Sequence, residues 1–183
     1  MKSIKNLYSY PNSSPLLSDD IVEFHAARIL LLLKNCGKHG KINGLTKMAK
    51  LDFFIRYPSF FEQICNYLDV SVNTTFDTVD SRMVRHHYGP WDHRYYHVLA
   101  FLSSRSLITV MKKSKSFELR LTKQGREISN TLASSEEFAS LQAHMLNVAG
   151  VLGGFTGNKL KKLIYSVFQE DIADLSLKEI IEG

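Results

Sequence analysis

Residues 107–126, LITVMKKSKSFELRLTKQGR, are the stretch of sequence that decides the fold. Residues 107–110 are strand-like, and residues 117–121 alternate apolar and charged side chains as an amphipathic strand does. The polar run between them, at residues 112–116, predicts a hairpin tip. Thr122 is a good N-cap residue for a helix that begins directly after the second strand. The stretch therefore predicts a β-hairpin with a basic tip that leads straight into a helix.

Helical patterns precede this hairpin. Between residues 20 and 36 the apolar positions go nearly all the way round the helix, which predicts a buried central helix. A second helix begins at Leu45 and breaks before Pro58, because the residue before a proline is biased away from helix. A third restarts at Ser59. Residues 37–40 are expected to form a turn.

Further helices are expected after Trp91, from Glu136 to about Val148, and from Asn158. Helices followed by a hairpin with a basic tip are the winged-helix order. We therefore predict a mainly α-helical fold with a small β-hairpin wing, a winged helix-turn-helix with additional C-terminal helices. The expected divisions are an N-terminal arm (1–18), a winged-helix domain (19–134) and a C-terminal helical extension (135–183).

The composition is that of a globular protein without a membrane span. The chain has 183 residues, of which 44% are apolar and 22% charged, enough to bury a core. Its longest apolar run, Ile29–Leu33, is far shorter than the roughly 20 residues that cross a bilayer. No signal peptide is evident at the start, and Cys36 and Cys65 have no CxxC spacing. These features predict a cytoplasmic protein that does not bind a membrane.

Charge is distributed unevenly along the chain. Residues 1–126 hold 19 Lys and Arg against 10 Asp and Glu, whereas residues 127–183 hold 4 against 8. A basic front and an acidic tail suggest an anionic partner at one end and a protein contact at the other. The alternative is an ordinary mixed, solvated surface.

Potential binding residues are densest in residues 80–97, DSRMVRHHYGPWDHRYYH. This stretch holds the only tryptophan and four of the seven histidines. The alternation before Gly89-Pro90 fits an extended segment, and Asp92 is a natural cap for a helix beginning near His93. The stretch predicts a surface that touches another molecule, but it indicates no reaction.

Two sets of contact residues follow from these patterns. Lysines at the hairpin tip would contact phosphates, although lysine on an edge strand also serves solubility alone. The helix after Trp91 lacks a row of Arg, Asn and Gln for reading base edges, so contact with a DNA backbone or a protein suits it better. The predicted nucleic-acid or partner contacts are Arg82, Arg85, His86, Trp91, Arg94, Lys112, Lys113, Lys115 and Arg120.

Contacts with a partner protein are expected at Arg56, Tyr57, Lys161 and Lys162. Arg56 and Tyr57 close the aromatic run at 51–58, and such residues are enriched at subunit interfaces. For the run as a whole, core packing of the second helix is the favoured interpretation, because aromatic stripes at helical spacing are usually core.

Metal and catalytic sites are not expected. His93 and His97 are one helical turn apart and could share a metal with His86 or His87, but no cysteine or carboxylate pair completes the ligand set. Partly buried, hydrogen-bonded histidines are the favoured alternative. The chain has no GxSxG, P-loop, HExxH or Cys-His nucleophile pattern. We therefore predict no metal, no cofactor and no enzymatic activity.

Three motifs resemble a known family. They are LTKMAKLDFFIRYP at residues 45–58, SRMVRHHYGPWD at residues 81–92, and the Leu-Thr-x-x-Gly-Arg closure at residues 121–126. Together they resemble the middle components of ABC three-component systems, which include the small subunit of Lamassu anti-phage defence. The resemblance covers about residues 22–168.

This resemblance implies a non-catalytic winged-helix subunit of a bacterial defence complex. Such a subunit would link an SMC-like ATPase, which senses aberrant DNA, to an effector, often a nuclease, and hold the effector in check until DNA is bound. Contact with DNA itself would be nonspecific in sequence. The alternative is a free-standing winged-helix transcriptional regulator, which would form a stable homodimer on one palindromic operator.

Overall fold

The computed structural model describes residues 21–72, 83–86, 89–114 and 116–169, together with residues 172, 176 and 181. The predicted arm at residues 1–18 lies outside the described residues. Within them the chain is mainly helical, with seven α-helices, a three-stranded antiparallel sheet and a two-stranded hairpin. The predicted mainly α-helical class is confirmed.

The helices and strands have the following bounds along the chain. The helices are α1 (Val22–Cys36), α2 (Leu45–Arg56), α3 (Pro58–Tyr67), α4 (Tyr95–Ser104), α5 (Lys123–Ala133), the 3-10 turn η3 (Glu136–Phe138), α6 (Ala139–Leu152) and α7 (Gly157–Val167). The strands are β1 (Lys41–Asn43), β2 (Val84–His86), β3 (Gly89–Trp91), β4 (Ile108–Lys113) and β5 (Ser116–Leu121).

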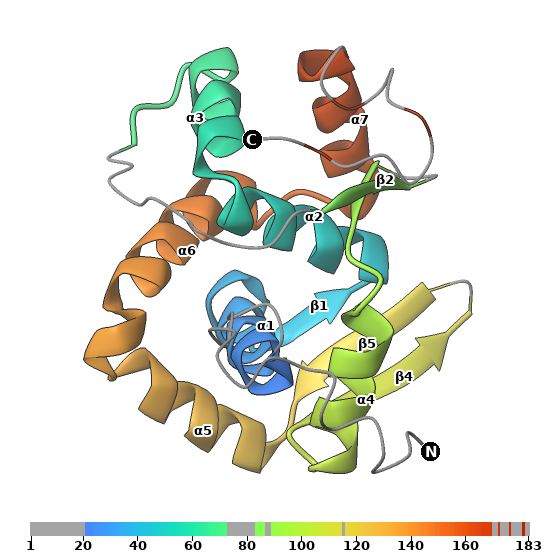
Figure 1. The fold of residues 1–183 in the computed structure, drawn as a ribbon, viewed down its shortest axis with the longest axis vertical. Coiled ribbons are helices and arrows are strands. Elements are labelled where there is room, and N and C mark those ends of the chain that lie inside the picture. Colours follow the sequence, from blue (N-terminus) through green and yellow to red (C-terminus); the bar gives the residue numbers. More distant parts are fainter. Residues whose placement is uncertain are drawn as a thin grey trace, which may run out of the picture.

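Helix α1 is the centre of the molecule. Figure 1 shows it surrounded by α2, α4, α5 and α6, all of which contact it. Its side chains are buried without interruption from His25 to Leu33. A helix that is apolar nearly all round can be stable only when other elements cover every side of it. The predicted buried central helix is confirmed.

The break between α2 and α3 falls where the proline predicts it. Helix α2 ends at Arg56, and Pro58 is the first residue of α3 rather than a residue before it. Proline is favoured at that position because the first N–H of a helix has no intrahelical partner. Phe53, Phe54 and Phe61 are fully buried around the break. The core packing favoured for the aromatic run is therefore confirmed.

The tryptophan stretch forms a small hairpin before its helix. Strand β2 pairs antiparallel with β3, so the extended segment before Gly89-Pro90 is confirmed. The second strand was not predicted, because it is only three residues long and contains a proline. Gly89 has a φ of +93°, which favours glycine. Asp92 follows the hairpin, and its carboxylate accepts the backbone N–H of Arg94 at the start of α4.

The predicted hairpin is present and carries a third strand. The order is β1-β5-β4, with Ile108 opposite Leu121 at the base and Lys113 opposite Ser116 near the tip. Strand β1 pairs antiparallel with β5 and was missed, because its three residues follow directly on the turn predicted at residues 37–40. Strand β4 lies at one edge of the sheet.

A tight closure fixes the base of this hairpin. The hydroxyl of Thr122 accepts the backbone N–H of Gly125 and donates to the carbonyl of Ser106 at 2.7 Å, with the carbonyl of Leu107 3.2 Å away. A Cβ on Gly125 would lie 1.9 Å from the Leu107 carbonyl oxygen, so only glycine fits there. Arg126 donates to the carbonyl of His39. The residues of the Leu-Thr-x-x-Gly-Arg motif therefore make the contacts that join the sheet to α5.

The last helices share the core of the first ones. Met145 and Val148 of α6 and Leu160 and Ile164 of α7 belong to the same buried cluster as the leucines of α1. Helix α6 begins three residues later than predicted, after η3, and α7 begins at Gly157 rather than Asn158. The division into domains at residues 19–134 and 135–183 stays a prediction. None of the described helices is long and apolar enough to cross a membrane.

Candidate functional site

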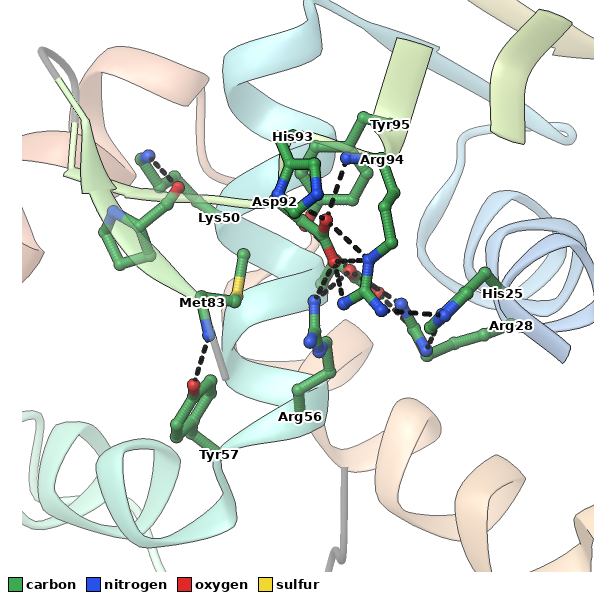
Figure 2. A network of polar contacts seen from close by, with 12 residues as sticks. His25, Arg28, Lys50, Arg56, Tyr57, Met83, Asp92, His93, Arg94 and Tyr95 are labelled. Atoms are coloured by element: carbon green, nitrogen blue, oxygen red, sulfur yellow. Dashed lines mark hydrogen bonds and ion pairs between the residues drawn. The ribbon is translucent and has the colours of Figure 1, made fainter. Parts of the chain in front are cut away.

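A buried network of charged side chains occupies the junction of α1, α2 and α4. Its centre is Asp92, which is 3% exposed. The Asp92 carboxylate accepts hydrogen bonds from Arg56 at 2.8 Å and from Arg94 at 2.7 Å (Figure 2). Burial alone would raise the pKa of Asp92, but the hydrogen bonds from Arg94 and the charge of Arg56 outweigh burial and hold this pKa well below its usual range. Asp92 therefore stays ionised inside the protein.

A second buried carboxylate, Asp52 on α2, extends the network. It accepts hydrogen bonds from Arg28 Nε at 2.9 Å and from the Tyr95 hydroxyl at 2.7 Å. Arg56 lies 3.9 Å from the same carboxylate, one helical turn along α2. Burial and the charge of Asp52 raise the pKa of Tyr95 well above its usual value, so the hydroxyl remains a donor.

His25 joins the network from α1. Its Nδ1 lies 3.1 Å from Arg28 and its Nε2 lies 3.2 Å from Arg94, so each ring nitrogen faces a guanidinium group. A neutral imidazole has one acceptor nitrogen, and it accepts from only one of these two donors at a time. Figure 2 shows the imidazole and the Arg28 side chain reaching from α1 toward the side chains around Asp92.

The network fixes where α4 lies. Helix α1, helix α2 and the turn before α4 each contribute charged groups to it, and breaking a buried ion pair by removing one partner is strongly destabilising. Because α4 begins at Tyr95, directly after Arg94, the ion pairs of Asp92 and Arg94 set the position of that helix relative to α1 and α2. The network therefore orients elements of the fold.

A buried lysine on α2 forms a hydrogen bond with the backbone of the β2–β3 hairpin. Lys50 is 1% exposed and donates to the carbonyl of Pro90 at 2.9 Å. Burial, together with the charge of Lys161, lowers the pKa of Lys50 to about 7. A Cβ on Gly89 would lie 3.4 Å from the Lys50 nitrogen, so the glycine lets the hairpin backbone approach the amine closely.

Helix α4 presents an aromatic and histidine face to solvent. The side chain of His93 is 85% exposed and Tyr96 is 65% exposed, with His97 on the same face. The half-buried ring of Trp91 lies 5.8 Å from that of Tyr96. His93 and His97 are therefore exposed, and not partly buried as was favoured from the sequence.

The hairpin holds its own counter-charge. Glu118 on β5 accepts hydrogen bonds from Lys113 and Arg120, both at 2.9 Å, and Lys41 of β1 lies 3.6 Å away. The hydrogen bond from Lys113 is the largest of the effects that lower the pKa of Glu118. One acidic side chain thus compensates part of the basic charge of the hairpin. Lys112 points to the other face of the sheet, where it is exposed beside Phe117.

The structure places most of the predicted contact residues. Arg94 and Trp91 lie at the edge of the buried network, and Lys112, Lys113 and Arg120 are exposed on the hairpin. On α7, Lys161 is half-buried and Lys162 exposed. Arg82 and Lys115 lie outside the described residues, as do the side chains of Arg85 and His86, whose backbone forms β2.

Two predicted contacts are corrected. Arg56 and Tyr57 were expected at a partner interface, but they are 2% and 8% exposed. Arg56 is held by Asp92, and the Tyr57 hydroxyl accepts the backbone N–H of Met83 at 2.6 Å. Both side chains therefore serve the interior of this chain.

Sequence reasoning missed the remaining members of the network. Arg28 and His25 interrupt the apolar surface of a central helix, and Asp52 interrupts an aromatic run. A charged residue inside a segment that is otherwise buried signals a buried partner, because an isolated charge is too costly to bury. The sequence contains this signal at His25, Arg28 and Asp52, although it does not identify the residue that each of them contacts.

Among the described residues no group of three or more His, Cys, Asp or Glu could hold a metal ion. No family model, curated protein or solved structure matches the chain.

Proposed function

We propose that the chain is a winged-helix protein with two insertions. The supporting order is α1, β1, α2, α4, β4 and β5, with α3 and the β2–β3 hairpin inserted between α2 and α4. The pairing of β1 with β5, and of β5 with β4, is the arrangement of a wing and its supporting strand. Helix α4 directly precedes the wing and so occupies the place of the recognition helix.

In function, the chain is proposed as a non-catalytic accessory subunit of a bacterial anti-phage defence complex. It would bridge an SMC-like ATPase and an effector nuclease in the cytoplasm, with sequence-nonspecific contact to the DNA backbone. The observation that carries this proposal is the ion pair between Arg56 and Asp92. It joins the motif at residues 45–58 to the motif at residues 81–92, the two stretches on which the family resemblance mainly rests.

The arrangement supports binding rather than catalysis. Arg56 of one motif and Asp92 of the other bond to each other in the interior, so their effect is to hold α4 and the hairpin in place. The outward groups at the start of α4, namely His93 just before the helix and Tyr96 and His97 within it, suit stacking and protein contact more than base reading. A rigid support under an exposed aromatic face suits a subunit whose task is to dock.

The charge on the hairpin favours weak DNA contact. Lys113 and Arg120 donate hydrogen bonds to Glu118, which offsets part of their charge. Lys112 is exposed on the opposite face of the sheet. Phosphate contacts by a few lysines give sequence-tolerant binding that weakens steeply with salt. This is the behaviour expected of an accessory subunit whose ATPase partner supplies most of the affinity.

The first test is a pull-down of the tagged chain expressed with its neighbouring genes, followed by mass spectrometry. Recovery of an SMC-like ATPase in a stable ratio is the expected result. Tyr96→Ala should reduce this recovery, whereas Tyr67→Ala, at an equally exposed tyrosine on α3, should not. A chain that recovers no ATPase and is retained on one palindromic DNA site would instead be a transcriptional regulator.

A second test measures DNA binding by the chain alone over a range of salt concentrations. Affinity should be similar for unrelated duplexes, and Lys112→Ala should reduce the slope of log K against log salt by about 1. Lys162→Ala removes the same charge from α7 and should leave the slope unchanged. A large preference for one duplex would contradict nonspecific contact.

A further inference from the structure

Helix α6, like α4 but unlike α5 and α7, carries no charged side chain. Its 14 residues, ASLQAHMLNVAGVL, contain no Asp, Glu, Lys or Arg. Leu141, Met145, Val148 and Leu152 bury one side of it against α1 and α2. Exposed helix faces are normally charged, as they are on α5 and α7. The outer side of α6 therefore needs a separate explanation.

The outer side of α6 carries a narrow stripe of small residues and one leucine. The stripe consists of Ala139, Ala143, Leu146 and Gly150, all of them exposed, and Leu146 is 54% exposed. Their spacing of four, three and four residues is that of the contact positions of a coiled coil. A Cβ built on Gly150 meets no atom within 4 Å, so the described part of the chain leaves that end of the stripe uncovered.

The two ends of α6 are oppositely charged. At its N-terminus, Glu136 and Glu137 line a hollow of about 660 Å³ whose other walls include Ala139, Ala143 and Leu146. At its C-terminus, the ammonium group of Lys47 donates to the carbonyl of Gly153 at 2.6 Å. The stripe thus runs from an acidic end to a basic end.

From these features we infer that α6 is the contact between two copies of this chain, packed antiparallel about a two-fold axis. Such a contact uses the same patch on both copies, so the patch must be self-complementary. An antiparallel arrangement satisfies this condition, because the acidic end of each helix meets the basic end of the other. A parallel arrangement would place like charges together.

The sizes of the side chains fit the same register. When Ala143 faces the partner's Leu146, Ala139 faces the partner's Gly150, and the same two contacts recur on the other side of the axis. Each leucine then lies against an alanine, and the small residues let the helices approach closely. This register also brings Glu136 to the partner's Gly153, where Lys47 is bound.

The inferred contact is independent of the proposed function. In Figure 1, α6 lies on one side of the molecule and the β4–β5 hairpin on the other. A dimer through α6 would leave α4 and the hairpin of both copies exposed. Failure to recover an ATPase would overturn the proposed function and leave the dimer standing, and a monomeric chain would do the reverse.

Sedimentation equilibrium of the full chain tests the inference. The chain should dimerise below about 0.1 mM, and Ala143→Glu should raise the dissociation constant at least about tenfold. Gln124→Glu adds the same charge at an exposed position of α5 and should leave the constant unchanged. A chain that is monomeric at about 0.1 mM, or a dimer indifferent to Ala143→Glu, would overturn the inference.

Mixing two variants tests the antiparallel register. Ala143→Glu and Leu146→Lys should each be monomeric alone, because each places a charge against an apolar side chain. Mixed in equal amounts they should form a heterodimer, because the glutamate of one copy faces the lysine of the other. Circular dichroism of each variant checks that it is folded. Folded variants that fail to associate when mixed would contradict this register.

Discussion

Asp92 and Glu118 make similar contacts in very different surroundings. Each is a carboxylate bound by two cationic side chains at 2.7–2.9 Å, and each has a side chain that is 3% exposed. The partners differ: Arg56 is fully buried beside Asp92, whereas Lys113 and Arg120 are 58% and 45% exposed beside Glu118. Water therefore hydrates Lys113 and Arg120 on the hairpin but does not reach the Arg56 side chain.

The difference separates two uses of charge. In the buried network, loss of one member leaves a partner unsolvated, so the ion pairs hold α1, α2 and α4 in one arrangement. On the hairpin, loss of Glu118 leaves hydrated cations that gain the ability to bind another anion. The first set of charges fixes the fold, and the second adjusts what the surface attracts.

The largest effect is expected at Asp92. Asp92→Asn should lower the free energy of unfolding by about 3–5 kcal/mol, because Arg56 and Arg94 lose a buried counter-ion. Urea denaturation measures this change, with Asp69→Asn, at an exposed aspartate, as the control. The wild type should also lose stability as the pH falls through the depressed pKa of Asp92. A variant as stable as the wild type would mean that the network adds nothing to the fold.

Tyr95→Phe should have the next largest effect. Removing the hydroxyl takes a hydrogen bond from the buried Asp52 carboxylate and should cost about 1.5–3 kcal/mol of unfolding free energy. Tyr96→Phe is the matched control, because Tyr96 is 65% exposed and its hydroxyl is solvated. Equal effects of the two substitutions would contradict the contrast between interior and surface.

Lys50→Met should raise the free energy of unfolding at pH 7, in contrast to the two substitutions above. The pKa of Lys50 is lowered to about 7, so the folded state binds its proton less readily than the unfolded state does. Wild-type stability should therefore rise with pH between about 7 and 10.5, and the variant should lack this rise. At pH 7 the variant should be more stable by about 1–3 kcal/mol, by analogy with other buried charges replaced by apolar groups. Denaturation at both pH values checks this, with Lys162→Met as the control, and a variant less stable at pH 7 would contradict it.

Glu118→Gln should change stability least. Its cationic partners are hydrated, and surface ion pairs add little to folding. The effect should appear in DNA binding instead, where the slope of log K against log salt should steepen by about 1 as Lys113 and Arg120 become available to phosphates. An unchanged slope would show that the hairpin does not contact DNA.

The helices and the main hairpin could be predicted because their signals are local. The break at Pro58, the cap at Thr122 and the alternation of residues 117–121 each act within a few residues. Strands β1 and β3 were not predicted, because three residues are too few to show a periodic pattern. Their existence depends on partners supplied from elsewhere, β5 in one case and β2 in the other.

The site was harder to predict because its bonds are long-range. Asp52 meets Arg28 across 24 residues, Arg56 meets Asp92 across 36, and His25 meets Arg94 across 69. The sequence marked Arg56 and Arg94 as important but could not say whether they face inward or outward. That choice is made by packing, since an arginine is suited equally to an interface and to a buried carboxylate.

The closure at Thr122 and Gly125 has a consequence for how this protein can diverge. Because the strands of the hairpin are locked together at their base, residues could be added or removed at the tip without strain reaching α1 or α5. Loop tips generally accept such insertions. Related chains could therefore differ in the length and charge of this hairpin while keeping the same core. The same tip would accept a fluorescent label or an affinity tag that leaves the interior undisturbed.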